Sequence, residues 1–238
     1  MWSPHLAAAL GLALLAGLSV PAGAYLGRRQ SLYPGWLTDE FRHAVIAFGG
    51  GALFAAVALV LIPEGAKHLP GWASLAAFVA GGGVFCFLDQ ALARRGGHGA
   101  QFMAMLLDFL PEAMALGALI AEDWALAVLM AGLILLQNLP EAFNAYREMD
   151  APGQTRRTVI WLFILAVPMG VIAALIGQVV LTEMKGALGL ILLFAAGGIV
   201  YLVFEDVAPQ ARLDRSHLPP LGAVAGFALG LAGHLAAG

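Results

Sequence analysis

The stretch QFMAMLLDFLPEAMALGALIAEDWALAVLMAGLILLQNLPEAFNAY, residues 101–146, decides the fold. It contains two long apolar runs, 101–121 and 125–146, separated by the acidic pair Glu122 and Asp123. A helix of roughly 20 apolar residues is long enough to cross about 30 Å of hydrocarbon. The stretch therefore predicts two antiparallel transmembrane helices joined by a short turn.

The rest of the chain has the same character. Hydrophobic residues make up 61% of the 238 positions, charged residues 11%, and the mean hydropathy is +0.86, whereas a soluble domain is about 45–50% apolar and about 25% charged. Six further runs qualify as spans: 6–26, 42–62, 72–93, 158–181, 187–208 and 218–236. No segment between them is long enough for a soluble domain. We therefore expect an all-α polytopic membrane protein with eight transmembrane helices, forming a single domain over residues 1–238.

The basic residues predict the orientation of these spans. Of the 12 Lys and Arg residues, all but Lys67 and Lys185 fall in the loops after the first, third, fifth and seventh spans. They are Arg28, Arg29, Arg42, Arg94, Arg95, Arg147, Arg156, Arg157, Arg212 and Arg215. Basic loops stay in the cytoplasm, so we expect both termini outside and a multi-pass protein of the inner (plasma) membrane.

The charge distribution and the cysteine content limit the class of protein further. No basic residue precedes the first apolar run, which predicts a retained span rather than a cleaved signal peptide. The net charge of −3 gives no reason to expect a nucleic-acid partner, and membrane lipid is the expected surrounding. The single cysteine, Cys86, excludes an intrachain disulfide.

Acidic residues occur at mid-span, where charged groups are rare. The motif Leu-Pro-Glu-Ala appears twice, at 110–113 and at 139–142. Asp108 and Glu112 are four residues apart and therefore share one helix face, as do Gln137 and Glu141 on the neighbouring helix. Antiparallel packing would bring three carboxylates and an amide oxygen to one depth in the membrane.

Each motif also contains a proline. Pro111 and Pro140 lack an N–H group, which leaves the carbonyls of Leu107 and Leu136 without a helical donor. Unwound carbonyls at membrane depth occur where they line a cavity or bind a cation. The prolines therefore predict helix breaks beside the carboxylates.

The mid-span acids need a counter-charge, because an ionised side chain at the bilayer centre costs about 2.5–3.5 kcal/mol. No Lys or Arg lies inside a predicted span, so a salt bridge is excluded. Protonated, hydrogen-bonded acids or a water-filled cavity are alternatives. A divalent cation, which satisfies several carboxylates at once, is the leading interpretation.

Other polar residues give weaker signals. Glu205 and Asp206, near the cytoplasmic end of the seventh span, are either an exit station for an ion or solvated interfacial residues. Asp89 is expected to be a solvated or capping residue. Glu64 and His68 follow the second span on the outer side, where they give a slight signal for an entry role. Glycine rows at 49–51, 81–83 and 197–198 predict close helix packing rather than phosphate binding.

The paired Pro-Glu motifs on the fourth and fifth of eight spans resemble those of the ZIP (Zrt/Irt-like protein) family of divalent metal transporters. The resemblance implies import of zinc, iron or manganese, with cadmium as a further substrate, by a homodimer with an elevator-like movement. Matched position by position, the implied metal-binding residues are Glu112, Gln137 and Glu141, with Asn138 at a second-metal position and Glu205 and Asp206 at the release side.

The chain also departs from the family pattern. Asp108 replaces the usual histidine, Phe109 the following asparagine and Ala113 the motif glycine, while Val167 stands where many bacterial members have glutamate. These changes predict one metal site made only of oxygen ligands. Zinc remains the first expected substrate because the resemblance implies it. Oxygen ligands also suit manganese, and manganese and iron are the next expected substrates.

The resulting expectation is a divalent metal importer and not an enzyme, with the metal as transported substrate. A metal-dependent enzyme in the membrane would need histidine ligands, and no histidine lies at mid-span. The alternative is a degenerate metal-binding ZIP homologue with a structural or regulatory role and no flux.

Overall fold

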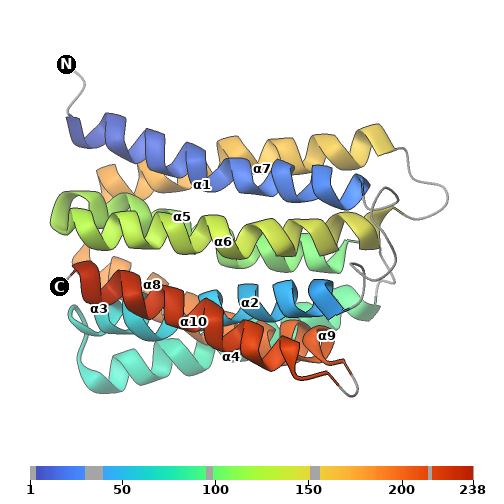
Figure 1. Ribbon diagram of the computed structural model, residues 1–238. Coiled ribbons are helices and arrows are strands. Elements are labelled where there is room, and N and C mark those ends of the chain that lie inside the picture. Colours follow the sequence, from blue (N-terminus) through green and yellow to red (C-terminus); the bar gives the residue numbers. More distant parts are fainter. Residues whose placement is uncertain (1–3, 30–39, 95–98, 151–155, 214–215, 238) are drawn as a thin grey trace.

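A computed structural model describes residues 4–29, 40–94, 99–150, 156–213 and 216–237. These residues form a bundle of helices that contains no strand (Figure 1). Its elements in chain order are α1 Pro4–Arg28, α2 Glu40–Ala56, η3 Val57–Leu61, α3 Ile62–Ala66, α4 Gly71–Arg94, α5 Ala100–Glu122, α6 Trp124–Met149, α7 Arg156–Ile176, η4 Gly177–Leu181, α8 Lys185–Leu202, η5 Val203–Val207, α9 Ala208–Ala211 and α10 Leu218–Ala237. The elements labelled η are π-helical turns.

Eight helical stretches are long and apolar enough to cross a membrane. They are Ala7–Arg28, Glu40–Ala66, Gly71–Ala91, Gln101–Glu122, Trp124–Met149, Arg157–Leu181, Lys185–Ala211 and Leu218–Ala237. Each overlaps one predicted span and starts or ends within a few residues of it. In the described residues, the predicted all-α architecture with eight helices long and apolar enough to span a membrane is therefore confirmed.

The helices divide into two groups. One group contains α1, α5, α6 and α7, in which α1 packs on α6 and α7 while α5 packs on α6 and α7. The other contains the pairs α2–α10 and α4–α8, joined by η3 and α3 on α8. The groups meet where α2 contacts α6 and α8 contacts α5.

Glycine allows the closest approaches inside each group, as the glycine rows predicted. A Cβ at Gly51 would lie 2.0 Å from the Ala223 carbonyl oxygen across α2–α10, and one at Gly81 would lie 1.8 Å from the Phe194 carbonyl oxygen across α4–α8. At Gly49, which faces the other group, the nearest atom is instead a side-chain carbon of Pro140, at 2.9 Å. Backbones therefore touch within a group, whereas side chains separate the two groups.

The two ends of the bundle differ in charge. One end carries Arg28, Arg94, Arg147 and Arg157, and we call it the basic end. The opposite end, which we call the terminal end, holds the start of α1, the finish of α10, Lys67 and Lys185 (Figure 1). Arg95 and Arg215 lie outside the described residues.

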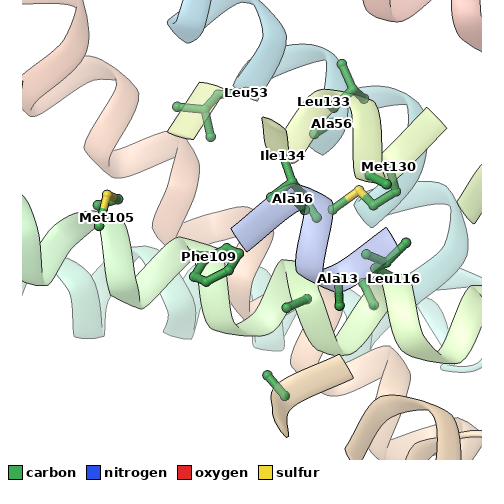
Figure 2. Packing of buried hydrophobic residues seen from close by; sticks show 14 of the residues in the cluster. Ala13, Ala16, Leu53, Ala56, Met105, Phe109, Leu116, Met130, Leu133 and Ile134 are labelled. Carbon is green, nitrogen blue, oxygen red and sulfur yellow. The ribbon is translucent and has the colours of Figure 1, made fainter. Parts of the chain in front are cut away.

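The middle of the bundle is apolar and tightly packed. Side chains from α1, α2, α5 and α6, among them Ala16, Leu53, Phe109 and Ile134, form one buried cluster (Figure 2). Phe109 is fully buried, and a Cβ at Gly170 of α7 would lie 2.2 Å from its ring. The polar side chains described next are therefore set in a hydrocarbon-like interior.

Candidate metal centre

A tight turn sets α5 and α6 side by side. α5 ends at Glu122, Asp123 adopts an extended conformation, and α6 begins at Trp124. The Asp123 carboxylate accepts a hydrogen bond of 2.9 Å from the N–H of Leu126, which caps the start of α6. The short turn makes the two helices antiparallel neighbours, as the sequence predicted.

The polar faces of the two helices meet in register. Gln137 Nε2 donates a hydrogen bond to Glu112 Oε2. Four residues back along α5 and four forward along α6, the carboxylates of Asp108 and Glu141 are close enough to repel each other. The structure therefore brings Asp108, Glu112, Gln137 and Glu141 together at mid-span.

The same register continues to the basic end of the pair. Seven residues before Asp108 along α5 and seven after Glu141 along α6, the backbone N–H of Gln101 donates to a Glu148 oxygen at 3.2 Å. The two antiparallel helices therefore keep one register over this length. Polar side chains face each other in successive pairs from mid-span toward the basic end.

Most oxygens of this cluster lack a donor. Glu112, Gln137 and Asn138 are fully buried, and Asp108 is 3% exposed. Glu112 Oε1, Gln137 Oε1, both carboxylate oxygens of Glu141 and both amide atoms of Asn138 are buried without a hydrogen-bond partner in the described part of the chain. Asp108 Oδ1 accepts the N–H of Phe109 at 2.8 Å. Leaving a buried polar group unpaired costs about 1–3 kcal/mol, so the arrangement calls for a cationic or hydrogen-bonding guest.

No basic side chain neutralises the mid-span acids. Asp108, Glu112 and Glu141 form no ion pair with any Lys or Arg that the structure describes, and the charges acting on Asp108 and Glu141 are other carboxylates. Lys67 and Lys185 are engaged at the terminal end, with Glu64 and Glu122. The mid-span acids therefore have no counter-charge from a basic side chain in the described residues.

The prolines do not break the helices, so this prediction is wrong. α5 and α6 remain α-helical through Pro111 and Pro140, because packing against neighbouring helices can compensate for the lost backbone hydrogen bond. Irregular backbone appears elsewhere, in the π-helical segments η3 and η5, which precede Pro63 and Pro209. A π-helical turn shifts the hydrogen-bond pattern by one residue and so accommodates the missing proline donor.

The acids are gathered but not drawn to a single point. Among the described residues, the group of three or more acids or histidines whose ligand atoms all lie within 4.8 Å of one another is a different one, Glu64 with His68 and Glu122. Binding one ion to Asp108, Glu112 and Glu141 together therefore requires a movement of their side chains, or the use of the Gln137 oxygen in place of one carboxylate.

A cavity leads from the acids toward the basic end. It is small, with a volume of about 50 Å³, and lies between α2, α5, α6 and the segment formed by the last residue of α8 with η5 and α9. Its polar lining residues are Gln101, Asp108, Glu141, Asn144, Asp206 and Gln210. The cavity is thus formed at the junction of the two helix groups and places carboxylates along its length.

Three of these lining residues, Gln101, Asn144 and Gln210, were not singled out from the sequence. A signal was present in α6, where Gln137, Glu141 and Asn144 are spaced by four and three residues and so share one face. Extending the face of the predicted site by one turn would have found Asn144. Gln210 lies on another span, and no local pattern connects it to the site.

The remaining predicted residues separate into those inside and outside this cavity. Asp206 lines the cavity and lies close enough to Glu141 to repel it. Glu205 is exposed on the outside of the bundle, and Asn138 is buried away from the cavity lining. Asp89, expected to be solvated or capping, is partly buried and accepts a hydrogen bond of 3.0 Å from the Tyr201 hydroxyl.

Comparison with known proteins supplies no relative for this site. No protein-family model matches the chain, and no curated protein is significantly similar to it.

Proposed function

We propose that this protein is a divalent metal transporter of the ZIP type that imports metal into the cytoplasm across the plasma membrane. The observation that carries the proposal is the mid-span cluster of Asp108, Glu112, Gln137 and Glu141, whose buried oxygens largely lack donors and have no basic partner in the described residues. A divalent cation stabilises such a cluster because it neutralises two carboxylates and coordinates several oxygens at once.

The cavity supports movement of the ion rather than static binding. It joins Asp108 and Glu141 to Asp206 and Gln210 near the basic end, which the positive-inside rule favours as the cytoplasmic end. Asp206, close to Glu141, offers the ion a further ligand on its way inward. Glu205, exposed on the outside, takes no part in this path.

The helix packing supports an elevator-like mechanism. α5 and α6 carry the site and belong to the group that also contains α1 and α7, while the other group contains α2, α4, α8 and α10. Side chains such as Pro140 against Gly49 separate the two groups. In the proposed homodimer, the group that carries the site moves relative to the other.

The donor set supports one metal rather than two. Phe109 occupies the position where the family carries a second-metal ligand, and its ring packs against Gly170. Val167, on the same helix as Gly170, contributes no donor. One site with only oxygen ligands binds zinc and also harder ions such as manganese; iron and cadmium are further substrates. Asn138, which forms no side-chain hydrogen bond in the described residues and does not line the cavity, is not a ligand in this proposal.

Catalysis is not part of the proposal, because no histidine lines the cavity in the described residues. The second candidate function is a degenerate homologue that binds metal without flux. It is favoured by the spacing of the acids, which places no three of their ligand atoms within 4.8 Å of one another.

Uptake into proteoliposomes tests the proposal. We expect the parent chain to take up zinc in competition with manganese, iron, cobalt and cadmium, and Glu112→Ala or Glu141→Ala to lower the uptake rate on the order of 100-fold or more, because loss of a metal ligand exceeds the about 10–100-fold effect of outer-shell partners. Glu183→Ala removes an exposed acid and serves as the matched control. Equal uptake by the Glu141→Ala variant and the parent would overturn the site assignment, and metal binding without uptake would establish the degenerate alternative.

A further inference from the structure

A second group of metal-ligating side chains lies at the terminal end of the bundle. Glu64 belongs to α3, His68 lies two residues after the end of α3, and Glu122 is the last residue of α5. Each offers one ligand atom, and these atoms all lie within 4.8 Å of one another. Ligands in a tetrahedral zinc site, each about 2.0–2.2 Å from the metal, are about 3.3–3.6 Å apart, so binding requires these atoms to draw closer by side-chain rotation.

The approach of these residues depends on the packing of α3 against α8. Gly65 and Gly189 face each other there, and a Cβ at Gly189 would lie 2.8 Å from the Gly65 carbonyl oxygen and 3.3 Å from His68 Cβ. This contact holds His68 against the start of α8. Glu122 reaches the same place from α5, which contacts α8 across the junction of the two groups.

One imidazole nitrogen of His68 has no hydrogen-bond partner in the described residues. This nitrogen, Nε2, is buried. An imidazole nitrogen left unpaired in the interior is destabilising, but a neutral imidazole nitrogen is also the commonest metal ligand in proteins. The imidazole lies beside two carboxylates and has an unpaired nitrogen, and a cation is a partner that would satisfy both.

Two lysines supply the charge that a metal would bring. Lys67 binds Glu64, and Lys185 binds Glu122. Both lysine side chains are largely in solvent, 60% and 49% exposed, whereas the Glu64 side chain is 9% exposed. A divalent cation carries the same charge as the two ammonium groups, so it can replace them at the carboxylates while the lysines turn outward at little cost.

We infer that Glu64, His68 and Glu122 form a binding site for a zinc-like divalent cation at the terminal end, separate from the mid-span cluster. One imidazole nitrogen, two carboxylate oxygens and a water complete a four-coordinate site, a set that suits zinc and its neighbours. The inference goes beyond the proposed transport function and does not depend on it, since the site can bind metal whether or not the chain moves metal across the membrane.

Zinc binding to the purified full-length chain in detergent tests this inference. Isothermal titration measures affinity and stoichiometry, and zinc X-ray absorption detects imidazole coordination. We expect Glu141→Ala to retain one bound zinc with an imidazole ligand. Adding His68→Ala to that variant should lower the affinity at least about tenfold, given that even outer-shell partners contribute about 10–100-fold, and should remove the imidazole signal.

Matched controls separate a ligand from a structural residue. His234 lies in the last turn of α10 at the same end, so His234→Ala should leave the imidazole signal in place. Glu122→Gln should weaken binding, whereas Glu183→Gln, at an exposed acid of the same end, should not. Equal zinc binding by His68→Ala and His234→Ala, or an absence of imidazole coordination in the Glu141→Ala variant, overturns the inference. Failure of transport alone leaves these binding results unaffected, so the two proposals are distinguishable.

Discussion

The mid-span cluster and the terminal cluster use similar acids in opposite electrostatic settings. Asp108, Glu112 and Glu141 are surrounded by apolar helices and have no basic partner among the described residues. Glu64 and Glu122 instead bind Lys67 and Lys185, whose side chains reach solvent. Two groups of carboxylates in one chain thus differ chiefly in whether a long cationic side chain can reach them.

The difference follows from the depth of each cluster. A lysine at a helix end can bind an acid and still keep its ammonium partly in water, whereas a lysine at mid-span would itself cost about 2.5–3.5 kcal/mol. The terminal acids are therefore neutralised by the protein, whereas the mid-span acids have no basic partner among the described residues and, in the proposed function, are neutralised by the transported cation. The donor types differ as well, since the terminal cluster includes the His68 nitrogen and the mid-span cluster offers only oxygen.

The largest expected effect is on stability, because the repulsion at mid-span has no internal compensation. Glu141→Gln removes one of the buried charges and should raise the melting temperature of the metal-free protein, corresponding to about 1–3 kcal/mol for an unpaired buried group. The parent should instead gain about 2.7 kcal/mol in metal at 100 times its Kd. Thermal unfolding in detergent, followed by tryptophan fluorescence with and without manganese, measures both effects.

The control for that experiment is Glu183→Gln, an exposed acid that should behave as the parent does in both conditions. If Glu141→Gln keeps the full manganese-dependent shift in melting temperature, the mid-span acids do not bind the metal, and the contrast between the clusters disappears.

Exchanging the donor types should produce the next largest effect. Asp108→His introduces an imidazole at mid-span and should shift the preference of uptake from manganese toward zinc by about tenfold, because nitrogen ligands favour zinc. His68→Asp makes the terminal cluster all-oxygen and should shift zinc and manganese affinities there in the opposite direction. Competition uptake reports the first change and titration the second; parallel shifts in both variants would show that the two clusters do not differ in donor chemistry.

The smallest effect concerns the lysines. Lys185→Ala frees Glu122 from a competing ammonium group and should raise zinc affinity at the terminal cluster only a few-fold. It should change stability by at most about 1 kcal/mol, since exposed ion pairs contribute little. Zinc titration of Glu141→Ala and of Glu141→Ala with Lys185→Ala measures the difference in affinity. Weaker zinc binding after loss of Lys185 would contradict the proposal that zinc replaces the lysine ammonium groups at these carboxylates.

Much of this architecture could be predicted from the sequence because membrane insertion acts on local composition. The eight apolar stretches, the turn at Glu122 and Asp123 and the shared faces of Asp108 with Glu112 and Gln137 with Glu141 all follow from residue type and helical periodicity. Glycine packing was predictable for the same reason, since rows of small residues permit close backbone contact.

Other features depended on contacts between distant segments. Local rules predicted helix breaks at Pro111 and Pro140, but packing keeps both helices continuous. Asp206 and Glu205 are adjacent in sequence, and only the direction of the π-helical segment η5 places the first in the cavity and the second outside.

The acids at mid-span, and the lack of any basic residue beside them in the same spans, were determined by the sequence itself, because charge and hydropathy are local properties. The approach of Glu122 to Glu64 and His68 was decided by the tertiary structure alone. Glu64 and His68 are four residues apart in one segment, whereas Glu122 comes from the end of a distant helix, α5, and reaches them because α3 and α5 both pack on α8. No spacing rule within one helix connects Glu122 to the other two residues, since its proximity to them is a product of helix–helix packing.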